Sequence, residues 1–226
     1  MAARSVVFRA LCVVALLSAC AEESEKSEIP DTTYAQPEEA SYASGRGSVQ
    51  APQLRFTDIT ELSGIDFSHE NGAVGDKWMP ETMGSGCALF DYDEDGDLDA
   101  LLVNGQRWDG KGDTLTRLYE NGGKADFADV TERVGLDVNV YGMGANVADY
   151  DADGDLDVYV TALGPNVLLR NGAGRFVDVA KQAGVSGERW LDDQGRSNDE
   201  WSTSAVWFDV DGDGWLDLLV TNYIRW

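Results

Sequence analysis

Short apolar runs recur along the chain, and each is bounded by Asp, Asn or Gly residues. Three of them directly follow acidic segments: Leu98–Val103, Leu156–Val160 and Leu216–Val220. They are rich in Leu and Val and lack the apolar spacing that marks one face of a helix. We therefore expect three buried β-strands, each beginning where an acidic segment ends.

Further strand-like segments surround these three. Cys87–Phe90 leads into the first acidic segment. One alternating pattern is shared by Phe56–Thr60, Phe127–Thr131 and Phe176–Ala180. An Asn-Gly pair, the strongest short signal for a β-hairpin, precedes the last two at residues 121–122 and 171–172. One repeating unit is thus expected to hold four short strands, as in the blade of a β-propeller.

The acidic segments are three copies of one nonapeptide, which open at Asp91, Asp149 and Asp209. In each copy acidic side chains occupy positions 1, 3, 5 and 9, and the glycine at position 6 permits a sharp bend. Calcium takes about six to eight oxygen ligands, so the odd-numbered carboxylates of a tight loop can converge on one ion. Position 7 is expected to offer only its backbone carbonyl, because its side chain differs between the copies.

These nonapeptides, the acidic loops, therefore predict three calcium sites. The expected ligands of the first are Asp91, Asp93, Asp95, Asp97 and Asp99. Those of the second are Asp149, Asp151, Asp153, Asp155 and Asp157. Those of the third are Asp209, Asp211, Asp213, Trp215 and Asp217. The alternative is that the loops are acidic turns without a metal.

An EF-hand begins with the same acidic spacing but closes with a bidentate Glu at position 12. The corresponding residues in this chain are Leu102, Val160 and Val220. The segments that follow are strand-like, where an EF-hand requires a helix. The EF-hand is therefore excluded.

The acidic loop with its following strand resembles the FG-GAP or VCBS repeats of calcium-binding β-propellers. Four segments are also similar to bacterial relatives of cartilage acidic protein, a family often ending in an ASPIC/UnbV domain: Phe56–Thr60, His69–Gly72, Pro80–Gly84 and Val220–Tyr223. The resemblance covers residues 55–226 and implies an all-β fold, a β-propeller of four-stranded FG-GAP-like blades. About two and a half blades are present, so we expect an N-terminal fragment of a longer protein.

The first residues have the features of a bacterial lipoprotein signal. Arg4 and Arg9 flank the apolar stretch Ala10–Leu17, which is too short for a stable membrane anchor. Leu17–Cys20 resembles a lipobox, which implies acylation of Cys20 and an outer-membrane destination. An ordinary cleaved signal with a chance cysteine is the alternative. We expect a signal peptide over residues 1–19, a disordered acidic linker over 20–52 and the partial propeller over 53–226.

The formal net charge is −24, and 15 of the 41 acidic residues lie in the acidic loops. The remaining negative charge opposes nucleic-acid binding and favours cations or basic partners. Cys87 is the one cysteine expected in the mature chain, and its apolar neighbours favour a small buried side chain over a reactive thiol.

Two insertions, at residues 71–84 and 188–200, precede the first and third acidic loops and should emerge at one rim of a propeller. In or beside them lie four candidate ligand contacts: His69, Trp78, Trp190 and Trp201. The indoles can stack on a sugar or a peptide. Alternatively, they pack back over the core and His69 orders a loop.

With one histidine, the sequence offers neither a Ser-His-Asp triad nor a zinc site. The sequence therefore favours a non-enzymatic, calcium-binding lipoprotein outside the cytoplasm, serving adhesion or protein recognition in the periplasm or at the cell surface. A glycan-binding surface module and a propeller enzyme completed by further blades stay open as alternatives.

Overall fold

The computed structural model describes residues 56–111, 115–187 and 189–225. Contacts between Cα atoms divide the chain into two units, Leu11–Asp58 and a larger one that includes Ile59–Trp226. Of the smaller unit only residues 56–58 are described, and they are exposed and irregular. The predicted signal peptide, the acylated Cys20 and the linker lie outside the described residues.

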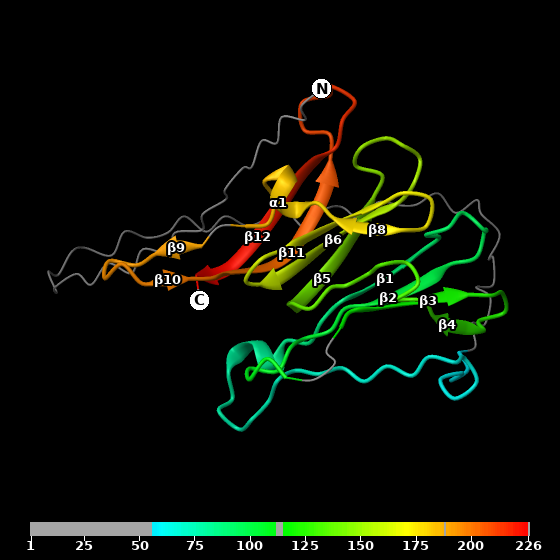
Figure 1. Cartoon of the computed structure of the whole chain (residues 1–226), viewed down its shortest axis with the longest axis horizontal. Helices are drawn as coiled ribbons and strands as arrows, with labels where there is room; N and C mark the ends of the chain where they lie inside the picture. Colours follow the sequence, from blue (N-terminus) through cyan, green and yellow to red (C-terminus); the bar gives the residue numbers. More distant parts are fainter. Residues whose placement is uncertain (1–55, 112–114, 188, 226) are drawn as a thin grey trace, which may run out of the picture. The chain divides into compact units, whose positions relative to one another are not determined.

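The larger unit begins with an irregular segment and a short 3-10 helix, η1 (Met79–Thr82). A four-stranded antiparallel sheet follows, in which the strands are ordered as in the chain (Figure 1). Its strands are β1 (Cys87–Phe90), β2 (Asp99–Leu102), β3 (Arg117–Asn121) and β4 (Phe127–Asp129). All four predicted strands of this unit are confirmed, with the first acidic loop between β1 and β2.

The same order of strands is repeated directly afterwards. The second set is β5 (Tyr141–Ala148), β6 (Asp157–Leu163), β7 (Val167–Asn171) and β8 (Phe176–Asp178). The one-turn helix α1 (Ala180–Ala183) and the hairpin of β9 (Trp190–Leu191) and β10 (Ser197–Asn198) follow. Then β11 (Glu200–Phe208) and β12 (Asp217–Arg225) repeat the first two strands of a unit. The described part of the chain is therefore nearly all-β and antiparallel, as predicted.

The first two apolar runs that follow the acidic loops form the core. The third, Leu216–Val220, was predicted to be buried but is only partly so, because β12 lies at the edge of its sheet. Leu101 of β2 and Val158 of β6 are fully buried, and each lies opposite a buried leucine of the next strand, Leu118 and Leu169. These residues belong to one hydrophobic cluster that spans both four-stranded sets. The strands read as continuous apolar runs because both of their faces are covered.

The first strands of neighbouring sets approach each other closely. Gly86 N–H donates to the carbonyl of Met143 in β5 at 2.9 Å. Gly142 of β5 also lies against the residues that follow β2. A Cβ added at Gly142 would lie 2.3 Å from Val103 Cγ1 and 2.9 Å from the backbone carbonyl oxygen of Asn104. Glycine is required here because only a residue without a side chain lets the two backbones come this near.

The acidic loops lie at one end of the strands. They follow β1, β5 and β11 and precede β2, β6 and β12. Because the strands are antiparallel, the starts of β5 and β11 and the ends of β2 and β6 lie at the opposite end. The structure thus has a loop end and an opposite end, and these names are kept below.

Two further sequence predictions are wrong. Phe56–Thr60 is not a strand, because residues 56–59 are irregular and 60–62 form a turn. Cys87 is exposed and not buried. Strand alternation explains the second error: Phe90 faces the core, so Cys87 shares the opposite face with Leu89, which is 65% exposed. Within the described ranges, no helix is long and apolar enough to span a membrane.

Candidate metal centres

Each acidic loop is folded by the carboxylate at its first position. Asp91 accepts the N–H of Asp95 at 3.1 Å and that of the position 6 glycine at 2.9 Å. The same two bonds measure 3.1 and 3.1 Å in the second loop and 3.1 and 2.9 Å in the third. Position 4 has a left-handed φ in every copy: 62° at Glu94, 57° at Ala152 and 76° at Gly212. One loop conformation therefore occurs three times.

The carboxylate at position 9 joins the loop to the sheet. Asp99 is buried at the start of β2, and its Oδ2 accepts the N–H of Tyr92 at 3.0 Å. Its Oδ1 accepts the N–H of Asn121, from the β3–β4 hairpin, at 2.8 Å. Asp157 repeats both bonds at 3.1 and 2.8 Å. The Asn-Gly hairpin of each complete set thus supports the acidic loop of the same set.

Within each loop the carboxylates of positions 1, 3 and 9 converge. One oxygen from each of the three lies within 4.8 Å of the other two. We call these groups the acidic triads: Asp91, Asp93 and Asp99; Asp149, Asp151 and Asp157; and Asp209, Asp211 and Asp217. The fold brings together residues that were predicted as ligands in all three loops.

Positions 5 and 7 stand outside the triads. The position 5 carboxylate accepts the N–H of position 7, at 2.9 Å in Asp95, 3.0 Å in Asp153 and 2.9 Å in Asp213. The Oδ2 of Asp155 accepts the N–H of Ala173 from the β7–β8 hairpin at 2.9 Å. The side chain of Trp215 is 59% exposed. In this arrangement, position 5 stiffens the loop.

The electrostatics of the first two triads favour a bound cation. Burial raises the pKa of Asp99 above its ordinary value, and it raises that of Asp157 to about 6. Burial and the nearby Asp95 raise the pKa of Asp93, and Asp151 is affected in the same way by Asp153. The charged forms are therefore disfavoured unless a positive charge compensates them.

The donor set also fits calcium. Oxygens that share one calcium ion at about 2.3–2.6 Å lie no more than about 5 Å apart. The triads meet that limit, and all of their donors are hard carboxylate oxygens. Among the described residues, Asp151 Oδ1 is buried and has no hydrogen-bond partner. An orphaned buried oxygen that faces two other carboxylates needs a ligand.

The predicted rim residues differ in how exposed their side chains are. His69 is exposed, and Trp78 is 47% exposed. The backbone of Trp190 lies in β9, but its side chain is outside the described part. The prediction for Trp201 as a rim contact is wrong, because it is fully buried in β11 with Tyr141 and Met143. The alternative, an indole packed over the core, holds for Trp201.

Sequence reasoning missed a hollow at the opposite end, which we call the Trp108 pocket. Its volume is about 250 Å³, and its lining includes Gln106, Arg107, Trp108, Tyr141, Leu163 and Asp199. The residues come from the β2–β3 connection, the start of β5, the end of β6 and the second insertion. The only local signal was an Arg-Trp-Asp-Gly sequence at residues 107–110 in a connection between two short strands.

The chain resembles proteins of known family. Residues 91–160 match the FG-GAP-like repeat, a segment that holds the first two acidic loops. The chain is also similar to cartilage acidic protein 1 of Xenopus tropicalis, with 28% identity over 173 residues, or 74% of this chain and 23% of the frog protein. It thus spans about a quarter of the length of that curated relative. The predicted resemblance to FG-GAP repeats and cartilage acidic protein is confirmed to this extent.

Proposed function

We propose that each acidic loop binds one calcium ion and that the metal stabilises the fold. The observation that carries the proposal is the convergence of positions 1, 3 and 9 in all three loops. The unpartnered, buried Oδ1 of Asp151 and the match to FG-GAP-like repeats support it. Asp91, Asp93 and Asp99, with their counterparts, would hold the metal, and the backbone of position 7 would complete the shell. Positions 5 would support the loop or enter the shell when the metal binds.

We propose a structural role for calcium. Two of the triad's three members are tied into the loop or the sheet: Asp91 folds the loop, and Asp99 bonds to the β3–β4 hairpin. Without a cation, the crowded carboxylates repel one another, so metal binding and folding are coupled. His69, the one histidine in the sequence, lies just before the first insertion, and its side chain is exposed. We accordingly propose a non-enzymatic protein.

The repeated sets are proposed to be blades of a β-propeller. In each complete set four antiparallel strands pair in chain order, and the first strands of successive sets lie next to each other. The second set is also joined to β11 by one pair of residues, Trp201 and Leu163. That arrangement, with the FG-GAP-like repeat, supports radial repetition.

We further propose that this protein is a lipoprotein outside the cytoplasm that recognises a partner at the cell surface. The lipobox-like Leu17–Cys20 and the preceding apolar stretch support export and acylation. The net charge of −24 supports a partner that is not a nucleic acid. The insertions at the opposite end, with exposed Trp78, supply surface for recognition.

Thermal unfolding of the full-length protein, with calcium and after its removal, tests the metal proposal. We expect the midpoint to rise with calcium, and we expect Asp93→Asn, Asp151→Asn and Asp211→Asn each to reduce that rise. Position 3 is the best target, because it accepts one loop N–H, as Asp211 does from Asp213, whereas Asp91 and Asp99 accept two each. Asp97→Asn and Asp155→Asn are matched controls in the same loops.

The number of calcium ions bound distinguishes the metal proposal from its alternative. In calcium titration calorimetry, each position 3 variant should bind one calcium ion fewer than the parent protein, and both controls should bind as many as the parent. A protein that binds no calcium by calorimetry, and whose midpoint does not change, would refute the metal proposal and make the loops plain acidic turns.

A further inference from the structure

The Trp108 pocket has a built aromatic floor. Trp108 and Tyr141 stack with their ring centres 4.9 Å apart and an interplanar angle of 22°. The Nε1 of Trp108 donates to Glu81 Oε1 at 2.7 Å, and the hydroxyl of Tyr141 donates to the carbonyl of Asn71 at 2.7 Å. Trp108 nevertheless stays 36% exposed. The indole is thus fixed in orientation while part of its surface remains accessible.

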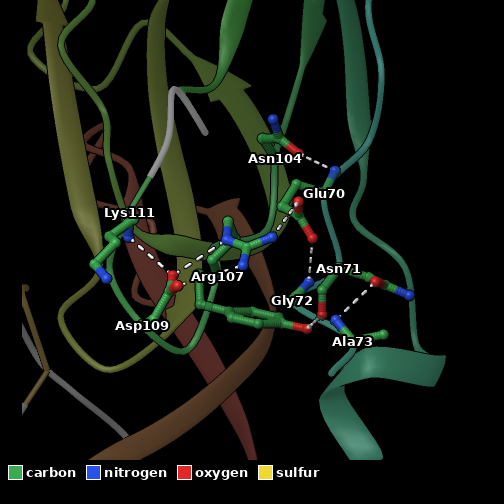
Figure 2. A network of polar contacts seen from close by, with 9 residues as sticks. Glu70, Asn71, Gly72, Ala73, Asn104, Arg107, Asp109 and Lys111 are labelled. Atoms are coloured by element: carbon green, nitrogen blue, oxygen red, sulfur yellow. Dashed lines mark hydrogen bonds and ion pairs between the residues drawn. The ribbon is translucent and has the colours of Figure 1, made fainter. Parts of the chain in front are cut away.

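Polar groups surround this floor and are also held in place. The guanidinium of Arg107 donates to both carboxylate oxygens of Asp109, at 3.1 and 3.3 Å, and lies 3.8 Å from Glu70 (Figure 2). Glu70 in turn accepts the N–H of Gly72 at 2.7 Å. This network fixes the first insertion against the β2–β3 connection, so the pocket wall is formed before any ligand arrives.

Both charged side chains that line the pocket are paired in the described structure. Arg107 pairs with Asp109, and Asp199 pairs with Arg189 at 2.8 Å. Gln106 donates to Asn139 at 3.1 Å, and its amide oxygen can still accept. The lining therefore combines an aromatic surface, an amide, a guanidinium and a carboxylate without an excess charge of either sign.

This chemistry suits a neutral, polyhydroxylated ring. The C–H face of a sugar can cover the indole, and its hydroxyls can donate to carboxylate or amide oxygens and accept from guanidinium N–H groups. A cationic ligand would be repelled by Arg107, and an anionic ligand would be repelled by Asp199. A hollow of about 250 Å³ has room for one small ring.

We propose that the Trp108 pocket binds one neutral monosaccharide unit of a glycan. Trp108 supplies the stacking surface, Tyr141 supports it from behind, and Arg107, Gln106 and Asp199 bond to hydroxyls. The inference names the ligand class of the proposed recognition protein and rests on that role, but not on calcium, because the pocket lies at the opposite end from the acidic loops.

Saturation-transfer NMR on the full-length protein with calcium tests this site. The probes are glucose, galactose, mannose and N-acetylglucosamine, with glucuronate and arginine amide as charged comparisons. We expect transfer to at least one neutral sugar, strongest at the protons of one ring face. Trp108→Ala should weaken that sugar's affinity about fivefold or more. Val177→Ala, which removes an exposed side chain of β8 outside the pocket lining, should leave the affinity unchanged.

Asp199→Asn is a second test of the site, which still applies if Trp108→Ala does not fold. Its ion pair is exposed, so the unfolding midpoint should stay near that of the parent while sugar affinity falls. The proposal is overturned if no neutral sugar receives transfer, if arginine amide binds instead, or if Val177→Ala weakens binding as much as Trp108→Ala. A calcium-dependent midpoint in the same samples would show that the metal proposal stands independently.

Discussion

The side-chain amide of Asn171 donates to the backbone carbonyl of Tyr92 at 2.8 Å, and this bond is buried. It joins the β7–β8 hairpin to the acidic loop of the preceding set. Tyr92 also packs against Phe176 of that hairpin, with ring centres 6.2 Å apart. Neighbouring sets are therefore linked at the loop end, directly beside Asp91 and Asp93 of the first triad.

Substitution of Asn171 should weaken this link. We expect Asn171→Ala to lower the free energy of unfolding by about 1–3 kcal/mol, because the Tyr92 carbonyl loses its partner in a buried place. Asn121→Ala is the matched control: its side chain holds the corresponding turn of the first set, but donates to the Leu98 carbonyl in an exposed place. Urea denaturation measures both. Equal losses in the two variants would contradict a special role for the link between sets.

Trp201 should behave as a core residue. It is fully buried, so Trp201→Ala is expected to cost about 3–5 kcal/mol of unfolding free energy. Trp78→Ala removes a half-exposed indole and should cost far less. Chemical denaturation followed by circular dichroism checks the pair. Equal losses of unfolding free energy in the two variants would contradict the buried position of Trp201.

Close approach of backbones should make Gly142 intolerant of a side chain. In Gly142→Ala the new methyl would collide with Val103 and with the carbonyl of Asn104, and we expect a loss of about 1–3 kcal/mol. Gly172→Ala is the control, since nothing lies within 4 Å of its added Cβ. Thermal melting in excess calcium compares them, and similar midpoints would show that the sets are not packed as described.

Stability should depend on pH in opposite senses with and without calcium. Burial raises the pKa of Asp157 from 3.8 to about 6, so the folded metal-free chain binds that proton more tightly than the unfolded chain. The stability of the metal-free protein therefore declines as the pH rises from 3.8, the ordinary pKa, through the folded-state pKa of about 6. Calcium binds the deprotonated carboxylate, so its stabilising effect should grow over the same interval.

Thermal melting of dialysed and calcium-loaded protein at about pH 4.5 and about pH 7.5 measures this effect. The calcium-dependent rise in midpoint should be larger at the higher pH, and Asp157→Asn should diminish the difference between the two. A rise that is the same at both pH values would argue against a carboxylate site.

Local sequence was enough to predict the strands and the acidic loops. Runs such as Ala100–Val103 contain no polar residue, and the Asn-Gly pairs fix where two hairpins turn. The shared alternation gave the starts of β4 and β8, at Phe127 and Phe176, but it failed at Phe56–Thr60. The same rule, combined with the burial of Phe90, would also have placed Cys87 on the exposed face.

The sequence by itself determined the repeated strand and loop pattern and the residues able to hold a cation, because both depend on spacing within about ten residues. Only the tertiary structure decided which carboxylates meet, because position 9 is placed by a hairpin more than twenty residues further on in the first set. It also decided that Trp201 enters the core while Trp108 lines a pocket. Contacts between distant segments settle these choices, and composition does not encode them.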